Sequence, residues 1–270
     1  MKVTVLIDNV AEGNMISEWG LSIYIEYGEQ RILLDTGASG KFMKNAEKMG
    51  IDISQVDIGI LSHAHFDHAN GMQRFFSTNS KAKFYLREGS KENCYSRKIF
   101  IPAYIGIKKG TLEKYKDRIQ FAEGDYEVSE GISLIPHKTG GLEKIGVKNS
   151  MYIRQSRKWV PDNFAHEQSL IFETEKGLVI FNSCSHAGAD TIIQEAASTY
   201  PGKKLYALIG GFHLFGLPEE SVRALACRIK ETGIEKVYTG HCTGEKAFLI
   251  LKDELGDIVY QLKTGLTITL

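Results

Sequence analysis

The hydrophobic pattern in the first third of the chain switches between the periods typical of strands and of helices. Residues 21–27 alternate between apolar and polar side chains, a turn follows at 28–30, and residues 31–35 return, which predicts a β-hairpin. Apolar residues then recur on one helical face up to Gly50. The elements expected here are a strand at 2–8, the hairpin, a helix carrying Phe42, Met43, Ala46 and Met49, a strand at 57–62, a helix from Gly71 to Phe76 and a strand at 83–86.

The second half of the chain repeats this plan. Residues 169–174 and 178–182 predict another hairpin, which also ends in a polar residue ahead of a helix. This likeness predicts two similar halves that pack sheet against sheet with helices outside, within a single domain spanning residues 1–270. Residues 87–130 fit the pattern poorly and are expected to form an insertion that borders the functional site. The later elements expected are a helix at 189–199, a strand at 204–209, a helix at 219–232, a strand at 236–239 and a helix at 243–255.

Composition argues against several classes of protein. The 33 basic and 33 acidic side chains cancel, whereas nucleic-acid binders usually show a basic excess, so we expect no nucleic-acid partner. The four cysteines form no C-x-x-C pair, which is typical of reduced thiols in the cytoplasm. Asp8 comes too early for a signal peptide, and no apolar run approaches the roughly 20 residues that span a bilayer. We therefore expect a cytoplasmic protein that acts on a small molecule and has no membrane partner; its oligomeric state is open.

One run of residues carries most of the chemistry: Ser62-His-Ala-His-Phe-Asp-His-Ala-Asn-Gly71. Three of the eight histidines fall within this run, directly after a strand of the buried type. His63 and His65 are two residues apart, so their side chains can point to the same side, while Asp67 and His68 follow a turn and approach from another direction. Four such groups crowd one tetrahedral ion but can serve two ions. Imidazole and carboxylate ligands suit zinc, and also manganese or iron.

Histidines after three later strands could complete such a site. His186 and His241 each come just after an apolar strand, as His63 does. Because ligands gather at the C-terminal ends of strands in open α/β folds, we expect all three to share one metal site. His213 also follows a strand, and it could be a ligand, a hydrogen-bond donor to substrate or a support for a ligand. The last two roles are favoured, since three ligands per ion and a bridging hydroxide already make a workable pair.

Several other polar residues have two interpretations each. Asp35, at the end of the first hairpin, either orients a ligating histidine or caps the strand end. Cys184 either binds metal as a thiolate or packs inertly in the core. The roles of His137 and His166 are open. The stretch 137–168 that contains them has a mild basic excess, which would suit an anionic substrate if it is not simply a solvated surface loop.

The run from His63 to His68, with Gly71 after it, resembles the His-x-His-x-Asp-His hallmark of the metallo-β-lactamase superfamily. Asp35, His186 and Gly240-His241 match the supporting motifs of that family in order. The resemblance implies an α/β fold: the four-layer αββα metallo-β-lactamase sandwich of two mixed β-sheets with helices on the outer faces. It also implies a metal site at one edge of the two sheets.

Three phrases are similar to a particular subgroup of the superfamily, the methanopterin-pathway ribofuranosylaminobenzene phosphate synthase-like, or dihydropteroate-synthase-related, proteins. They are residues 182–188, 210–214 and 240–244. In one respect the chain departs from the wider family, because many members carry an aspartate after the later hairpin that bridges both metals. Residues 182–186 contain no carboxylate, so either Cys184 substitutes or only a hydroxide bridges.

These motifs together predict a metal-dependent hydrolase. We expect two divalent metal ions, Zn²⁺ first among the candidates, to activate hydroxide that cleaves an ester-type bond in a small, anionic substrate, such as a phosphoester, thioester or lactone. Asp67 would also orient the hydroxide, and His213 would donate a hydrogen bond to developing negative charge. The expected metal ligands are His63, His65, Asp67, His68, His186 and His241.

Rival functions use the same fold. A flavodiiron-type oxidoreductase would carry a carboxylate at the second ligand position, where this chain has His65. A nuclease of the superfamily is weakened by the zero net charge and the lack of a basic arm. A metal- or ligand-binding sensor that has lost catalysis is disfavoured by the intact ligand set.

Overall fold

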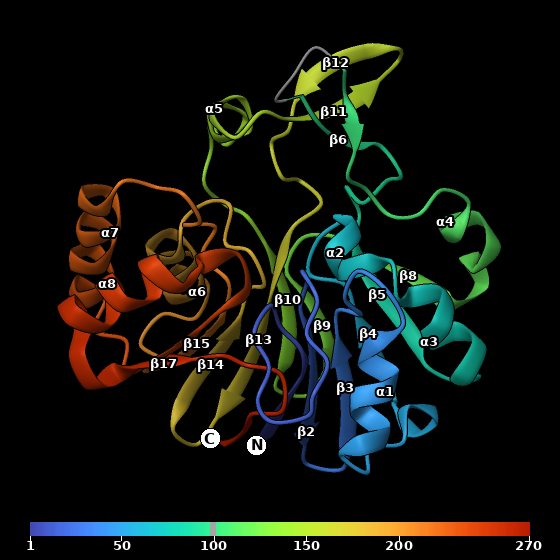
Figure 1. Cartoon of the computed structure of the whole chain (residues 1–270), viewed down its shortest axis with the longest axis horizontal. Coiled ribbons are helices and arrows are strands. Elements are labelled where there is room, and N and C mark those ends of the chain that lie inside the picture. Colours follow the sequence, from blue (N-terminus) through green and yellow to red (C-terminus); the bar gives the residue numbers. More distant parts are fainter. Residues whose placement is uncertain (98–100) are drawn as a thin grey trace. The chain divides into compact units, whose positions relative to one another are not determined.

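The computed structural model describes residues 1–97 and 101–270, which divide into two compact units (Figure 1). Unit 1 consists of Met1–Glu123, Gly141–Glu167 and Lys263–Leu270, and unit 2 of Gly124–Gly140 and Gln168–Leu262. The single domain with an insertion at about 87–130 stays a prediction, and residues 98–100 of that insertion lie outside the described residues.

A seven-stranded mixed sheet forms the centre of unit 1. Its order is β18-β1-β2-β3-β4-β5-β8, antiparallel from β18 to β3 and parallel from β3 to β8. The alternation in β2 and β3 places Ile23 opposite Leu34 and Ile25 opposite Ile32, and all four side chains are buried. The strands are β1 Lys2–Ile7, β2 Ser22–Tyr27, β3 Gln30–Leu34, β4 Ile58–Ile60, β5 Lys83–Arg87, β8 Ile119–Ala122 and β18 Thr267–Thr269.

Helices of unit 1 pack on this sheet through apolar faces. Phe42 of α1 and Phe75 of α3 lie in one buried cluster with Leu33 and Phe84 of the strands, and Figure 1 shows both helices beside β3, β4 and β5. The helical segments of this unit are α1 Lys41–Lys48, η1 Ile53–Gln55, α2 Phe66–Ala69, α3 Met72–Thr78, α4 Thr111–Lys114, η2 Lys116–Arg118 and α5 Glu143–Lys148.

Unit 1 also contains a small antiparallel sheet of order β12-β11-β6-β7. Tyr95 of β6 makes edge-to-face ring contacts with Tyr104 and Trp159, and Arg97 lies over the Trp159 ring. These contacts give the small sheet an aromatic and cationic character. Its strands are β6 Cys94–Ser96, β7 Ala103–Tyr104, β11 Met151–Gln155 and β12 Lys158–Pro161.

Unit 2 is built on a second seven-stranded mixed sheet. Its order is β17-β16-β15-β14-β13-β10-β9, antiparallel from β9 to β14 and parallel from β14 to β17. Each unit thus follows an antiparallel hairpin with parallel strands, in agreement with the similar halves that the sequence predicts. The strands are β9 Tyr126–Ser129, β10 Ile132–Pro136, β13 Gln168–Thr174, β14 Gly177–Phe181, β15 Leu205–Gly210, β16 Lys236–Thr239 and β17 Val259–Gln261.

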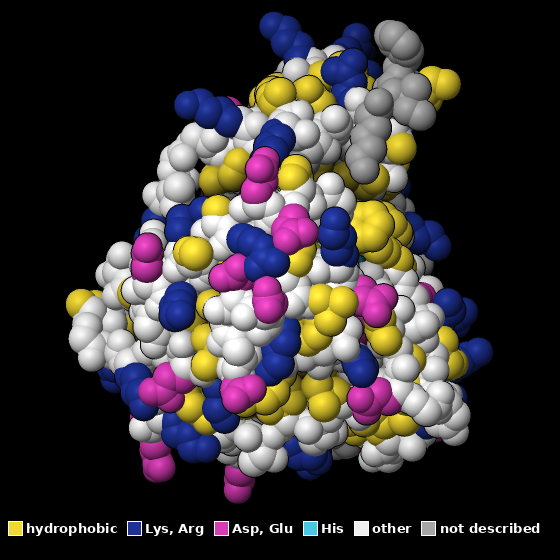
Figure 2. Space-filling model, turned by 60° about the vertical axis from the view of Figure 1, so that its left-hand side comes forward, with side chains coloured by type: hydrophobic (Ala, Val, Ile, Leu, Met, Phe, Trp, Pro, Cys, Tyr) yellow, Lys and Arg dark blue, Asp and Glu magenta, His cyan; other side chains and the backbone are white. Residues whose placement is uncertain are grey.

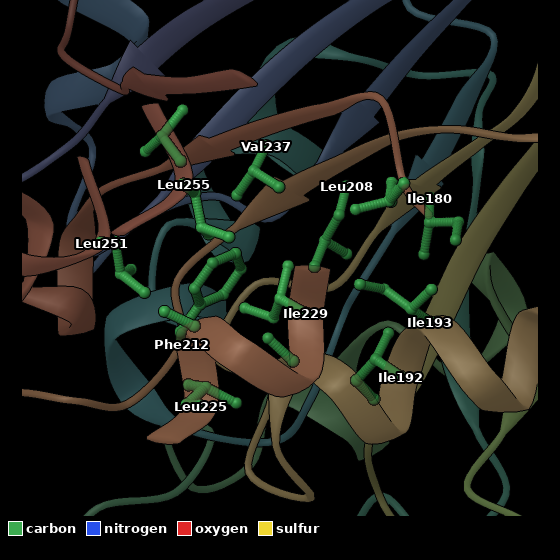
Figure 3. Packing of buried hydrophobic residues seen from close by; sticks show 14 of the residues in the cluster. Ile180, Ile192, Ile193, Leu208, Phe212, Leu225, Ile229, Val237, Leu251 and Leu255 are labelled. Atoms are coloured by element: carbon green, nitrogen blue, oxygen red, sulfur yellow. The ribbon is translucent and has the colours of Figure 1, made fainter. Parts of the chain in front are cut away.

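The core of unit 2 lies between this sheet and its three long helices, α6 Ala189–Thr199, α7 Glu219–Glu231 and α8 Glu245–Leu255. Figure 3 shows helix and strand side chains packed together. The 3₁₀ segments η3 His241–Thr243 and η4 Gly256–Ile258 flank α8. The labelled core residues are Ile180, Ile192, Ile193, Leu208, Phe212, Leu225, Ile229, Val237, Leu251 and Leu255.

The structure confirms the predicted α/β class with two mixed sheets, and the helices and strands predicted from periodicity are present with small shifts at their ends. Basic and acidic side chains are interspersed over the face of the described residues that Figure 2 shows. Within residues 1–97 and 101–270, no helix has both the length and the apolar character that crossing a bilayer requires.

Candidate metal centre

The histidine run begins where a buried strand of unit 1 ends. β3 and β4 are parallel neighbours, so the residues that follow them, Asp35 and Ser62, emerge at the same edge of the sheet. His65 has extended backbone and precedes the short helix α2, which carries Asp67 and His68 in its single turn. The four predicted ligands of the run are all buried: the exposed fractions are 0% for His63, 4% for His65, 7% for Asp67 and 0% for His68.

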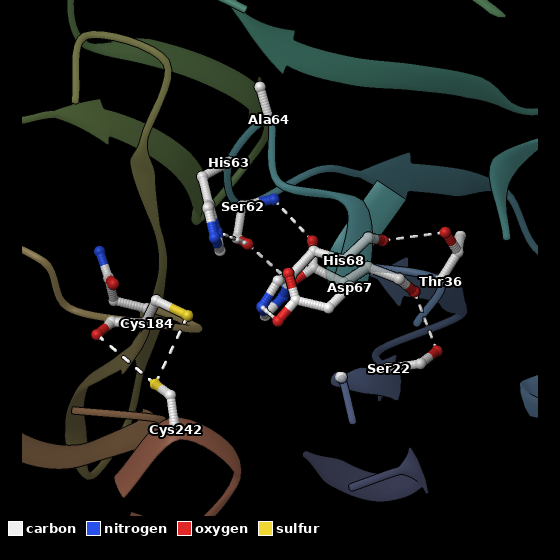
Figure 4. A network of polar contacts seen from close by, with 12 residues as sticks. Ser22, Thr36, Ser62, His63, Ala64, Asp67, His68, Cys184 and Cys242 are labelled. Atoms are coloured by element: carbon white, nitrogen blue, oxygen red, sulfur yellow. Dashed lines mark hydrogen bonds and ion pairs between the residues drawn. The ribbon is translucent and has the colours of Figure 1, made fainter. Parts of the chain in front are cut away.

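Asp35 contacts two residues that Figure 4 labels, Ser62 and His68. Its Oδ1 accepts the backbone N–H of Ser62 at 2.7 Å, and its Oδ2 lies 2.7 Å from the Ser62 hydroxyl and 2.8 Å from Nδ1 of His68. The carboxylate can only accept, so His68 carries its proton on Nδ1 and keeps the lone pair of Nε2. Of the two interpretations of Asp35, the structure supports the one in which it orients a ligating histidine.

Ser62 extends the effect of Asp35 to a second histidine. The Ser62 hydroxyl has one proton, which it donates to Asp35. Its contact with Nδ1 of His63, 2.9 Å long, must therefore be donated by the imidazole. His63 consequently holds its proton on Nδ1 and, like His68, keeps Nε2 as the nitrogen with a lone pair. One buried carboxylate thus sets the tautomer of both histidines.

The spacing of these groups suits metal ligation. The ring centroid of His63 lies 4.6 Å from that of His65 and 4.2 Å from that of His68. Nε2 of His68 lies 3.7 Å from Oδ2 of Asp67. Two donor atoms each ~2.1 Å from a tetrahedral ion lie about 3.4 Å apart, so Asp67 and His68 are spaced as two ligands of one ion would be.

Three more buried residues of unit 1 stand beside the run. The atoms of His65, Cys94, Asp162 and His166 that could ligate a metal all lie within 4.8 Å of one another. Nδ1 of His166 accepts the backbone N–H of Ala64, between the first two histidines of the run. Sequence reasoning left His166 open and did not single out Cys94 or Asp162; the spacing Asp162-x-x-x-His166 was the available signal.

In unit 2 the other predicted residues also follow parallel strands. His186, His213 and His241 come after β14, β15 and β16, which are consecutive parallel neighbours, so all three leave the same edge of that sheet. His213 and His241 have positive φ angles, 49° and 47°. Non-glycine residues in this region are uncommon, and they concentrate where a site fixes the backbone.

The structure groups these histidines with two cysteines. Ligand atoms of Cys184, His186 and His213 lie within 4.8 Å of one another, as do those of Cys184, His241 and Cys242. The Cys242 thiol donates to Sγ of Cys184 at 3.5 Å, and Cys242 Sγ accepts the backbone N–H of His213 at 3.2 Å (Figure 4 shows the two cysteines). Sequence reasoning missed Cys242, although it directly follows His241.

Opposing influences act on the Cys242 thiol. Burial raises its pKa. The hydrogen bond with Cys184 and the proximity of His241 and His213 lower the pKa by more than burial raises it, so the pKa lies well below its usual range. Unit 2 therefore combines imidazoles with a thiol whose pKa is lowered, a donor set that suits zinc, iron or cobalt.

The remaining histidine of open role lies elsewhere in unit 2. Nδ1 of His137 is 3.1 Å from Oε2 of Glu195 on α6, and both side chains are 6% exposed. Backbone N–H groups of Lys138 and Thr139 donate to the other carboxylate oxygen. The structure thus assigns His137 a buried ion-pair partner.

Comparisons with known proteins agree with this geometry. Residues 20–184 match the model of the metallo-beta-lactamase superfamily. The chain is 30% identical over 266 residues, 92% of this chain and 89% of the relative, to the 7,8-dihydropterin-6-methyl-4-(beta-D-ribofuranosyl)-aminobenzene-5'-phosphate synthase of Methanocaldococcus jannaschii. This similarity confirms the resemblance to the synthase-like subgroup.

Solved structures show the same fold. Tm1679, a metal-dependent hydrolase of the beta-lactamase superfamily, is 28% identical with a TM-score of 0.86, and the match covers 100% of this chain and 99% of that one. The Zn²⁺-bound PqqB of Methylobacterium extorquens is 12% identical with a TM-score of 0.57 and 100% coverage of both chains, which indicates the fold alone. The predicted metallo-β-lactamase sandwich is confirmed, and the chain belongs to the metallo-β-lactamase superfamily.

Proposed function

We propose that the chain is a metal-dependent hydrolase that cleaves an ester-type bond with water activated by two divalent metal ions. The observation that carries this proposal is the action of Asp35 on the histidine run. This buried carboxylate holds His63 and His68 with Nε2 unprotonated, as metal ligation requires. A cluster of histidines with a merely structural role does not require this.

The donor set fits divalent ions of the zinc type. We propose as metal ligands the residues that the sequence predicts: His63, His65, Asp67, His68, His186 and His241. Imidazole and carboxylate donors, buried and spaced as described for Asp67 and His68, are those that Zn²⁺ takes in proteins, and Mn²⁺ or Fe²⁺ accepts the same donors. When bound, the ions would lower the pKa of water toward neutrality and polarise a carbonyl or phosphoryl oxygen.

Two side chains have catalytic roles in this proposal. Asp67 orients the attacking water and holds its proton on a carboxylate oxygen until the leaving group departs. His213 donates a hydrogen bond to the negative charge that develops on the substrate oxygen. Cys184 lies in one group of possible ligands with His186 and His213 and in another with His241 and Cys242, so its thiolate would be available to a metal where many family members have an aspartate.

A small anionic substrate with an aromatic group agrees best with two observations. The name of the M. jannaschii relative describes a phosphate joined to aminobenzene and dihydropterin rings. In the small sheet of unit 1, Arg97 lies over the rings of Tyr152 and Trp159, and Arg154 lies over Trp159. Cations stacked on aromatic faces favour ligands that are both flat and negatively charged.

The test combines elemental analysis of the purified protein with turnover assays on phosphoesters, thioesters and lactones. We expect close to two equivalents of a divalent metal and turnover of at least one ester class. The variant that combines Asp67→Ala and His68→Ala should retain its fold by circular dichroism and lose turnover. Protein without stoichiometric metal, or unchanged turnover in the variant, would refute the proposal.

The identity with the M. jannaschii protein favours one second candidate, a synthase that forms the pterin–aminobenzene phosphate conjugate. The same metal ligands would serve that reaction. Chromatographic assay of the conjugate in both directions separates the candidates: formation without hydrolysis of any ester would favour the synthase.

A further inference from the structure

The loop that carries His166 lies against the histidine run within unit 1. We propose that His166 is a positioning residue of the metal centre: it accepts a hydrogen bond from the backbone N–H of Ala64 and thereby fixes the backbone of Ala64, which lies between His63 and His65. This inference rests on the proposed function, because it concerns how that centre is held in shape.

Two hydrogen bonds hold the His166 ring. Nδ1 of His166 accepts the N–H of Ala64 at 3.2 Å, a contact in which this nitrogen carries no proton. The proton therefore lies on Nε2, which donates it to Oδ2 of Asp162 at 3.0 Å. Both ring nitrogens are engaged with protein groups, and His166 is 3% exposed. A ring used in this way acts as a clamp on the backbone and not as a metal ligand.

Asp162 is itself held in place by a tight turn. Its second oxygen, Oδ1, accepts the backbone N–H of Phe164 at 2.8 Å, and the N–H of Glu167 reaches the carbonyl of Phe164 at 2.9 Å. Phe164 is fully buried and has a φ of +53°. A turn that is anchored by a buried aromatic ring and by an aspartate at its first position fixes the position of the His166 ring.

Two glycines allow other segments to press on this loop. A Cβ on Gly146 of α5 would meet the carbonyl oxygen of Asp162 at 2.2 Å, and a Cβ on Gly89 would meet the carbonyl oxygen of Ala165 at 2.3 Å. Neither position has room for a larger residue. The backbone on both sides of His166 is therefore confined by close packing, as a positioning element requires.

Ala64 is also held through its carbonyl, which belongs to the next peptide of the chain. The carbonyl of Ala64 accepts the N–H of Ile107 at 3.1 Å, and the N–H of Phe66 donates to the carbonyl of Ile105 at 2.8 Å. Ala64 thus has partners for both of its backbone groups, and the partner of its N–H is the side chain of His166. The directions of the His63 and His65 side chains depend on the backbone of Ala64, because these two residues are bonded to it on either side.

The test compares three replacements of His166 in the full-length protein. Asparagine places Oδ1 where Nδ1 stands and can still accept from Ala64; glutamine keeps a donor toward Asp162 but offers no acceptor near Ala64; alanine offers neither. Three quantities are measured for each variant. Competition with a chelator gives the Zn²⁺ affinity, and the metal content at saturation gives the Zn²⁺ stoichiometry. NMR of the metal-free protein gives the exchange rate of the Ala64 amide proton.

We expect His166→Ala and His166→Gln to weaken Zn²⁺ binding about 10–100-fold, as loss of groups that orient ligands does, with unchanged stoichiometry at saturation. His166→Asn should stay within a few-fold of the wild type, roughly 3-fold at most. The Ala64 amide should exchange faster in the alanine and glutamine variants than in the wild type and the asparagine variant. A merely structural role would not follow this order.

His137→Ala is the matched control, since His137 pairs with Glu195 at 3.1 Å in unit 2 as His166 pairs with Asp162. It should leave Zn²⁺ affinity unchanged. Wild-type affinity in His166→Ala, or equal losses in both alanine variants, would overturn the inference. So would loss of one Zn²⁺ equivalent at saturation, which would make His166 a ligand. A wild-type protein that binds no metal would instead overturn the proposed function, and this role with it.

Discussion

Oδ2 of Asp35 lies 2.8 Å from Nδ1 of His68, and both side chains are fully buried. The contact joins the end of β3 to the helix α2 and leaves His68 with an unprotonated Nε2. A hydrogen bond of this kind between a carboxylate and an imidazole holds a ligand ring in one orientation and raises its basicity. The function of the histidine run therefore depends on a residue 33 positions away in the chain.

Asp35→Asn should weaken metal binding about 10–100-fold while the chain still folds. An amide group brings N–H donors to a position where the Ser62 and His68 donors converge, so His68 must move or carry its proton on Nε2. Chelator competition with Zn²⁺ measures the effect. Asp57→Asn, at a half-exposed carboxylate paired with Lys81, should leave affinity unchanged; equal effects of both substitutions would contradict the role of Asp35.

Ser62→Ala should lower the free energy of unfolding by about 1–3 kcal/mol, because it leaves Nδ1–H of His63 buried without its acceptor and removes a donor to Asp35. Urea unfolding of metal-free protein measures the change. Ser77→Ala is the control: its hydroxyl donates to the carbonyl of Arg74 on the exposed side of α3, and its loss should change stability by less than about 0.5 kcal/mol. Similar losses of stability in the two variants would show that the Ser62 hydroxyl does not link Asp35 to His63.

The hydrophobic pattern predicted the main sheets and helices well because their periods are strong and their turns use recognisable residues. The hairpin of β11 and β12 was missed for a physical reason. Ser156 and Arg157 connect its strands with positive φ angles of 45° and 69°, a turn for which glycine or asparagine is the usual signal. The stretch 137–168, for which the sequence analysis predicted no helix or strand, contains the helix α5 and this hairpin.

The candidate site divides in the same way between local and non-local features. The ligands of the run and the later histidines follow strands that the pattern marks, so the sequence places them. The residues that fix them are distant in the chain: Asp162 and His166 reach the run from roughly 100 positions away, and no local pattern links them to it. Only the folded backbone reveals which of the two interpretations of Asp35 applies.

Glu195 should stabilise unit 2 in a pH-dependent way. Burial raises the pKa of its carboxyl group. His137 and the backbone N–H groups of Lys138 and Thr139 lower the pKa by more than burial raises it, so the pKa lies below its usual value of 4.5. A carboxyl whose folded pKa is lowered contributes its stability above the unfolded pKa and loses it as the pH falls through the folded pKa.

Glu195→Gln should accordingly destabilise the protein at pH 7, and the difference from the wild type should shrink as the pH falls below 4.5. Urea unfolding at a series of pH values between about 7 and 3 measures both curves. A difference that stays constant over this range, or that widens on acidification, would contradict the ionised pair.

The four cysteines should differ sharply in their reactivity with a thiol reagent such as DTNB. All four are free thiols, but Cys227 alone is exposed, whereas Cys94, Cys184 and Cys242 are at most 3% exposed. Reaction requires access as well as thiolate character, so the lowered pKa of Cys242 does not compensate for its burial. Native protein should show one fast equivalent, Cys227→Ser should remove it, and unfolded protein should show four. A second fast equivalent in the native protein, absent from Cys242→Ser, would show that the loop after β16 opens to solvent.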